Sequence, residues 1–93
     1  MHIIGLKVLF DYCRMNTNGK DALAAWQAEV LMASWQNFSE VKRHYISKSI
    51  GRDQVEFNVG MHQVITRVDY QRQTLMILNV NSKLNRSTRN KEL

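Results

Sequence analysis

The sequence predicts an α+β fold in which N-terminal helices pack on one face of a small antiparallel sheet. Two observations support this prediction. Between positions 6 and 45, apolar residues recur at spacings of three and four, which indicates amphipathic helices. From position 54 onward, apolar residues alternate with polar ones, which indicates strands with one buried face.

The chain of 93 residues is expected to form one domain, residues 1–93, because a chain of this length encloses a single hydrophobic core. No proline, serine-glycine linker or internal repeat marks a boundary. Residues 81–93 are mostly polar and basic. We expect them to form a C-terminal tail that is either a short helix or ordered only on binding.

Three helices are expected in the first half of the chain. The first covers Leu6 to Met15, and residues 16–19 form the turn that follows it. Asp21 can cap the second helix, and Ser39 can cap a short third helix that runs through Tyr45. The inner faces carry Leu6, Leu9, Phe10 and Cys13 in the first helix and Leu23, Trp26, Val30 and Ala33 in the second.

Strands are expected at residues 54–59, 64–70 and 74–80, which implies an antiparallel meander. If Val64, Thr66 and Val68 face the helices, the opposite face of the sheet is free to meet a ligand. That outer face carries Gln63, Ile65, Arg67, Met76 and Leu78. It is unusually apolar, which suits contact with a protein partner.

Composition excludes several classes of protein. The longest apolar stretch, Leu75 to Leu78, is far shorter than the roughly 20 residues of a membrane span. The only cysteine, Cys13, cannot form an internal disulfide, and the N-terminus has no signal-peptide pattern, which together favour the cytoplasm. The histidines at 2, 44 and 62 lack the spacing of metal ligands, so we expect no metal and no other cofactor.

The charge balance favours an anionic partner. Thirteen Lys and Arg against eight Asp and Glu give a net charge of +5, which favours approach to nucleic acid or to an acidic protein. No phosphate-binding glycine loop, nucleophile elbow or zinc-binding pair of cysteines is present. The common enzyme signatures are therefore absent.

A series of short segments nevertheless resembles a known family. The segments are Met1-His2-Ile3-Ile4, Ala22-Leu23-Ala24-Ala25-Trp26, Glu29-Val30, Trp35, Glu40-Val41-Lys42 and Val55-Glu56-Phe57-Asn58-Val59. In this order and spacing they resemble the HigB family of toxins, within the RelE and ParE superfamily, over roughly residues 1–80.

The resemblance implies a RelE/ParE-like sheet backed by helices, and a toxin that binds the ribosome and cuts messenger RNA. Its partners would be a cognate antitoxin, the ribosome and messenger RNA. DNA would be contacted only by the toxin–antitoxin complex, and no membrane partner is expected. Family members cut RNA without a metal, using the 2′-hydroxyl as nucleophile, while basic side chains orient and neutralise the phosphate.

The sequence departs from the family where catalytic residues are expected. His62-Gln63 stands in place of a Tyr-Arg pair, Leu78 in place of an arginine, and Ser82-Lys83 in place of a Thr-His pair. One hypothesis moves the chemistry to His62, Arg67 and Lys83, helped by Arg86. The alternative is a weakened or inactive toxin scaffold. In that case His62 is a turn residue, Arg67 a solvated strand residue and Lys83 a surface charge.

Five further basic residues are candidate contacts to RNA or the ribosome, because phosphate binding tolerates mobile Lys and Arg side chains. They are Lys42, Arg43, Lys48, Arg52 and Arg86. The alternative is that they solvate helix ends and loops. Three functions thus stay open: a messenger RNA endoribonuclease, a non-catalytic interaction module and a poison of a protein target such as a gyrase.

Overall fold

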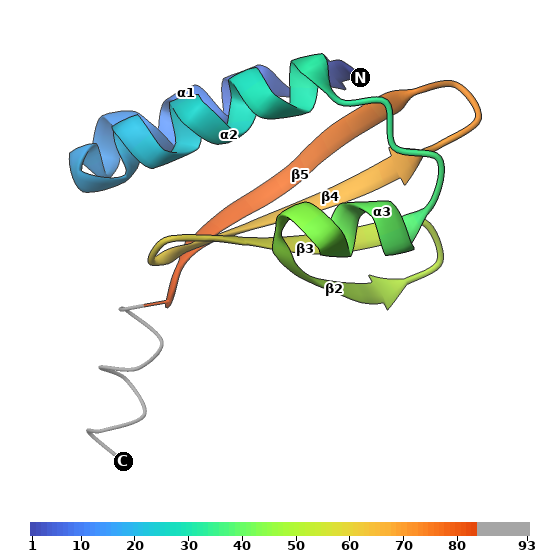
Figure 1. Cartoon of the computed structure of the whole chain (residues 1–93). Coiled ribbons are helices and arrows are strands. Elements are labelled where there is room, and N and C mark those ends of the chain that lie inside the picture. Colours follow the sequence, from blue (N-terminus) through green and yellow to red (C-terminus); the bar gives the residue numbers. More distant parts are fainter. Residues whose placement is uncertain (84–93) are drawn as a thin grey trace.

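The computed structural model describes residues 1–83 and shows three α-helices and one five-stranded sheet (Figure 1). The helices are α1 (Leu6–Met15), α2 (Lys20–Met32) and α3 (Phe38–His44), with a 3-10 turn, η1 (Thr17–Gly19), between the first two. The strands are β1 (His2–Ile4), β2 (Ile46–Gly51), β3 (Gln54–Val59), β4 (His62–Asp69) and β5 (Thr74–Ser82). The α+β fold predicted from the sequence is confirmed.

The sheet is mixed rather than purely antiparallel, which corrects the prediction. The strand order is β1-β5-β4-β3-β2, and β1 pairs parallel with β5 through Ile3 and Leu75, while every other pair is antiparallel. Neither β1 nor β2 was expected. The expected tail boundary at residue 81 is also wrong, because β5 continues to Ser82. The rest of the predicted tail, residues 84–93 with Arg86, Arg89 and Lys91, lies outside the described residues.

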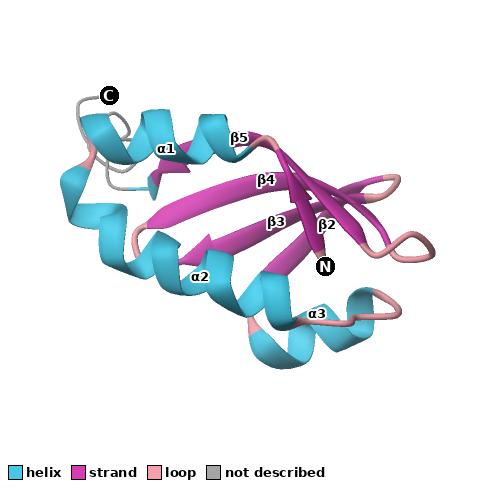
Figure 2. Cartoon of the chain, turned by 90° about the horizontal axis from the view of Figure 1, so that it is seen from above, coloured by secondary structure: helices cyan, strands magenta, loops and turns pink. Residues whose placement is uncertain are grey.

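The helices cover one face of the sheet (Figure 2). Helix α1 contacts β5, α2 contacts β1 and β3, and α3 contacts β2. Trp26 of α2 packs edge-to-face on Phe57 of β3, with ring centroids 5.3 Å apart, and both side chains are fully buried. Val64, Thr66 and Val68 of β4 are completely buried, so their predicted direction toward the helices is confirmed.

Backbone chemistry fixes where the helices begin. Gly5, at φ 89°, precedes α1, and a Cβ there would lie 2.7 Å from the Ile77 carbonyl oxygen, so the close approach of the chain to β5 after β1 requires glycine. The cap of α3 is Asn37 rather than Ser39, since the Asn37 side chain accepts a hydrogen bond from the Glu40 backbone N–H at 3.1 Å.

Helix α2 begins at Lys20, which places Asp21 in its first turn and not at its cap. A carboxylate in the first turn still stabilises the helix through the helix dipole. At the other end, the Met1 ammonium group donates hydrogen bonds to the carbonyl oxygens of Val30 at 2.9 Å and Ala33 at 2.7 Å. A cation on the last carbonyls is favourable for the same reason, and it ties the chain start to α2.

Phe10 does not lie on an inner face as predicted. Its side chain is 52% exposed and lines a groove between α1 and α2. None of the helices within residues 1–83 combines the length and the apolar composition needed to cross a bilayer.

Candidate functional site

The side of the sheet opposite α1 and α2 is called the open face. Side chains alternate in direction along a strand, so the residues between the buried core residues of each strand point to the open face. The open face comprises Ile46, Lys48, Gln54, Glu56, Asn58, Gln63, Ile65, Arg67, Asp69, Thr74, Met76, Leu78, Asn79 and Asn81.

One cross-strand row of the open face holds an opposite-charge pair. The row runs Lys48, Glu56, Ile65 and Asn79 across β2, β3, β4 and β5. Directly opposite residues have Cβ atoms about 4.5–5.5 Å apart, so Lys48 and Glu56 are cross-strand neighbours, but their side chains form no ion pair within residues 1–83. Gln63 donates a hydrogen bond from Nε2 to Glu56 Oε2 at 3.3 Å, which helps to orient the carboxylate.

The next row holds an exposed arginine. It runs Gln54, Arg67 and Met76, and Arg67 is exposed. Arg67 stands diagonally from Glu56, a relation that spans about 7–8 Å between backbones. Lys48 and Arg67 therefore lie on the two strands that flank Glu56, on the same face of the sheet.

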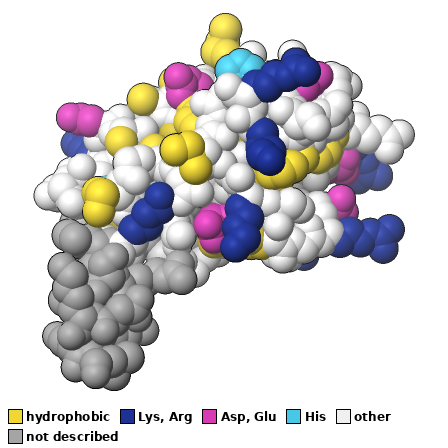
Figure 3. All heavy atoms as spheres, turned by 60° about the horizontal axis from the view of Figure 1, so that its bottom comes forward, with side chains coloured by type: hydrophobic (Ala, Val, Ile, Leu, Met, Phe, Trp, Pro, Cys, Tyr) yellow, Lys and Arg dark blue, Asp and Glu magenta, His cyan; other side chains and the backbone are white. Residues whose placement is uncertain are grey.

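Apolar side chains border these charges. Ile65 pairs with Asn79 and Thr66 with Ile77, so Leu78 is an extra residue in a bulge and lies on the open face beside Asn79. Leu78 is 38% exposed and Met76 37%. Figure 3 brings the bottom of the molecule in Figure 1 forward, and it shows Lys and Arg, Asp and Glu, and hydrophobic side chains interleaved on that surface.

His62 does not lie on the open face. It shares the direction of Val64 and Thr66, is 3% exposed, and its Nδ1 is 2.6 Å from Tyr12 Oη of α1. A Cβ on Gly19 would lie 2.6 Å from His62 Nε2, so the turn η1 closes over the ring. Burial lowers the pKa of His62, which favours the neutral ring.

The predicted trio of His62, Arg67 and Lys83 is not brought together. His62 and Arg67 are five residues apart on β4, which is roughly 17 Å along a strand, and they point to opposite faces. The Lys83 backbone N–H donates to the Met61 carbonyl oxygen at 2.8 Å, so Lys83 stands at the His62 end of β4. The prediction of one shared cleft is wrong, because the two-residue alternation of β4 directs His62 toward the helices and Arg67 to the open face.

The basic residues proposed to contact RNA follow one another around β2. Lys42 and Arg43 lie in the last turn of α3, Lys48 on β2, and Arg52 in the turn after β2. All four are exposed. Arg86 lies outside the described residues.

Glu56 was not among the candidate site residues predicted from the sequence. The signal was available: Glu56 stands between Val55 and Phe57 in the alternating stretch, and the buried direction of Phe57 sends Glu56 to the opposite face. From the sequence, Lys48 was assigned to no strand, and only the pairing of β2 with β3 places it beside Glu56.

Two pockets lie on the helix side of the molecule. A groove of about 600 Å³ between α1 and α2 is lined by Phe10, Cys13 and Lys20 among others, and burial raises the pKa of the Cys13 thiol, which disfavours a nucleophilic thiolate. An open pocket of about 790 Å³ lies between the end of α2 and α3, beside Trp35 and Arg43. Within residues 1–83, no three His, Cys, Asp or Glu side chains are grouped as metal ligands would be.

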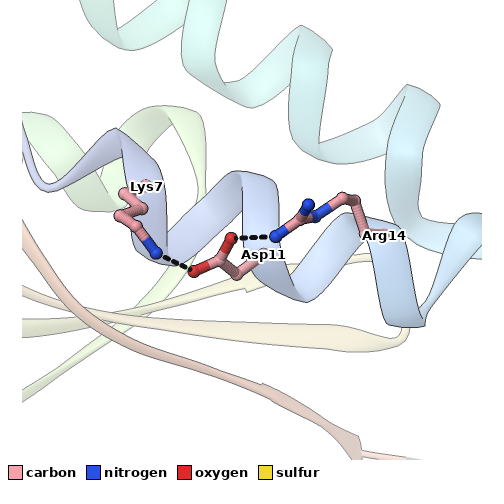
Figure 4. A network of polar contacts seen from close by, with 3 residues as sticks. All are labelled: Lys7, Asp11 and Arg14. Atoms are coloured by element: carbon pink, nitrogen blue, oxygen red, sulfur yellow. Dashed lines mark hydrogen bonds and ion pairs between the residues drawn. The ribbon is translucent and has the colours of Figure 1, made fainter.

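A charged network on α1 is a surface feature. Asp11 accepts hydrogen bonds from Lys7 Nζ at 2.8 Å and from an Arg14 guanidinium nitrogen at 2.7 Å (Figure 4). The hydrogen bond from Lys7 lowers the pKa of Asp11 most. Because Lys7 and Arg14 are largely exposed to solvent, this network contributes little to stability.

Comparison with known proteins places this geometry in context. A family model described as HigB_toxin, RelE-like toxic component of a toxin-antitoxin system, matches residues 19–83. No protein with a curated description matches the chain. The matched segment begins at the last residue of η1 and includes the whole open face of β2 to β5.

Proposed function

Because the chain belongs to the HigB toxin family, the RelE-like toxic components of toxin-antitoxin systems, we propose that it is a ribosome-dependent endoribonuclease that cuts messenger RNA on its open face. The family implies a cognate antitoxin as partner. The proposal places the toxin in the cytoplasm, where translated messages are found, with the ribosome presenting the substrate. The observation that carries it is the grouping of Lys48, Glu56 and Arg67 on adjacent strands.

The proposed reaction uses the 2′-hydroxyl of the message as nucleophile. Its oxygen bonds to phosphorus, and Glu56 accepts the hydroxyl proton. The bond from phosphorus to the 5′-oxygen breaks, the departing 5′-oxygen takes a proton from water, and a 2′,3′-cyclic phosphate is left on the other fragment. Lys48 and Arg67 stabilise the negative charge that accumulates on the phosphate, which is most effective when the cations are held in place by strands. Gln63 and Leu78 stand where the family pattern has arginines, and neither side chain carries a positive charge.

His62 and Lys83 take different parts in this proposal. His62 holds α1 and η1 onto the start of β4 and does not touch RNA, because it is 3% exposed. Lys83 follows β5 directly and extends the cationic surface beyond the sheet. Lys42, Arg43 and Arg52 contact ribosomal RNA through phosphates, and Arg86 is proposed to join them.

The test uses purified ribosomes carrying a defined message. The chain should cut this message only when the ribosome is present, and Glu56→Gln should slow cutting by about 10²–10⁴-fold. Arg67→Ala should also slow it, while Arg72→Ala removes an equal charge in the turn after β4 and should leave the rate unchanged. A message left intact by the unsubstituted chain would refute the proposal.

A non-catalytic toxin is the second candidate, favoured by the exposed Met76 and Leu78 on the open face. In that case the face binds a protein, and expression of the chain stops growth without cutting messages. A gyrase poison would give DNA breaks with messages intact. Substituting Leu78 by Arg separates these candidates from the leading one, since it should weaken protein binding but preserve or raise RNA cleavage.

A further inference from the structure

Strand β2 forms one edge of the sheet and is open along its outer side. It is last in the strand order, and the opposite edge, β1, has only three residues. The Ile46 side chain is 79% exposed and that of Ile50 39% exposed. The register of β2 shifts only at its end, between Ser49 and Gly51, so the stretch from Ile46 to Ser49 is regular. An edge strand with exposed apolar side chains is a template for another strand.

Two hydrogen bonds define which backbone groups of β2 point outward. Thr66 Oγ1 donates to the Val55 carbonyl oxygen at 2.8 Å, so the Val55 backbone groups point toward β4. Asn58 Nδ2 donates to the Ile46 carbonyl oxygen at 3.2 Å, so the Ile46 groups point toward β3.

In an antiparallel pair these directions alternate from one residue to the next. Ile46 and Lys48 therefore bond to β3 opposite Asn58 and Glu56. The N–H and C=O groups of Ser47 and Ser49 point away from the sheet, where an added strand would meet them.

The charge of this edge selects its occupant. Lys48 is exposed and makes no ion pair within residues 1–83, and Lys42, Arg43 and Arg52 lie on the elements that flank β2. A second copy of the chain that paired its Ser49 with Ser47 would place Lys48 directly opposite Lys48. Like charges opposite each other across two strands are destabilising, so self-pairing is disfavoured.

We propose that β2 binds an extended acidic segment of a protein partner, which adds a sixth strand to the sheet. The segment places an apolar side chain beside Ile46 and, two positions along, a carboxylate beside Lys48. Backbone hydrogen bonds to Ser47 and Ser49 supply affinity, and the alternating apolar and acidic side chains supply specificity. This binding does not depend on RNA cleavage, so the two proposals can fail separately.

The experiment measures amide hydrogen exchange in the full chain with a short synthetic peptide in which isoleucine, glutamate and isoleucine alternate with threonines. Exchange of the Ser47 and Ser49 amides should slow on addition of the peptide. A peptide with lysine in place of glutamate should bind about tenfold more weakly. Lys48→Glu should reverse this preference, whereas the matched control Lys7→Glu, on α1, should not alter it.

Three results would overturn the proposal. Unchanged exchange at Ser47 and Ser49 would show that the edge takes no strand. Protection by a single-stranded RNA oligonucleotide without protection by the peptide would make the edge a nucleic-acid surface. Concentration-dependent protection in the chain alone would identify a second copy as the occupant.

Discussion

The hydrogen bond between Tyr12 and His62 gives a direct test of the fold at the start of β4. Tyr12→Phe removes the hydroxyl that lies 2.6 Å from His62 Nδ1 and keeps the ring that packs edge-to-face on the imidazole at 5.5 Å. Because His62 is 3% exposed, its ring nitrogen then lacks a partner inside the protein. An unsatisfied buried polar group costs about 1–3 kcal/mol of unfolding free energy.

For a domain of this size, 1 kcal/mol corresponds to roughly 4–8 °C in Tm, so Tyr12→Phe should lower Tm by roughly 5–20 °C. Thermal unfolding followed by circular dichroism measures the change. Tyr70→Phe is the matched control, because the buried Tyr70 hydroxyl has no hydrogen-bond partner within residues 1–83. Its removal should leave Tm unchanged or raise it. Equal Tm values for the two variants would refute the reasoning.

Three other predictions concern the same corner and the open face. Burial lowers the folded-state pKa of His62 from its ordinary 6.5, so below pH 6.5 the unfolded chain binds more protons than the folded chain. The free energy of unfolding should therefore be highest above pH 6.5 and fall as the pH drops toward the folded-state pKa. Urea titrations at several pH values measure this change. Gly19→Ala places a Cβ 2.6 Å from the His62 ring and should cost about 1–3 kcal/mol in the same titrations, and a neutral effect would contradict the close packing of η1. Glu56→Gln should slow RNA cleavage without lowering Tm, since Glu56 lies on the half-exposed open face; a large fall in Tm would instead assign it a structural role.

Local periodicity predicted much of the fold. The three- and four-residue spacing of Leu23, Trp26 and Val30 located α2, and the alternation of Val55, Phe57 and Val59 located β3 and its buried face. These elements were predictable because each buries one face against the same core, and burial imposes its period on the sequence.

The edge strands were not predictable in this way. Strand β1 has three residues and depends on parallel pairing with β5, about seventy positions along the chain. Strand β2 is exposed along almost its whole length, so no burial imposes a period on Ile46 to Gly51. The bulge that leaves Leu78 exposed depends on pairing between β4 and β5, which the sequence of either strand alone does not reveal.

The candidate site was predicted only in part. Arg67 was expected on the outer face and is exposed there, but His62 was assigned by its place in a family pattern. The alternation that directs Val64 and Val68 to the core also directs His62 to the core, so the sequence contained the contrary signal. Lys48 and Glu56 required the register between two strands, which composition does not provide.

Mapping of transcript ends after brief expression of the chain without its antitoxin tests the central claim most directly. New ends are expected within translated messages. They should be lost in the double variant Lys48→Ala and Arg67→Ala but not in the control pair Lys7→Ala and Arg72→Ala. Growth arrest with intact messages, or undiminished cleavage by the double variant, would contradict the claim.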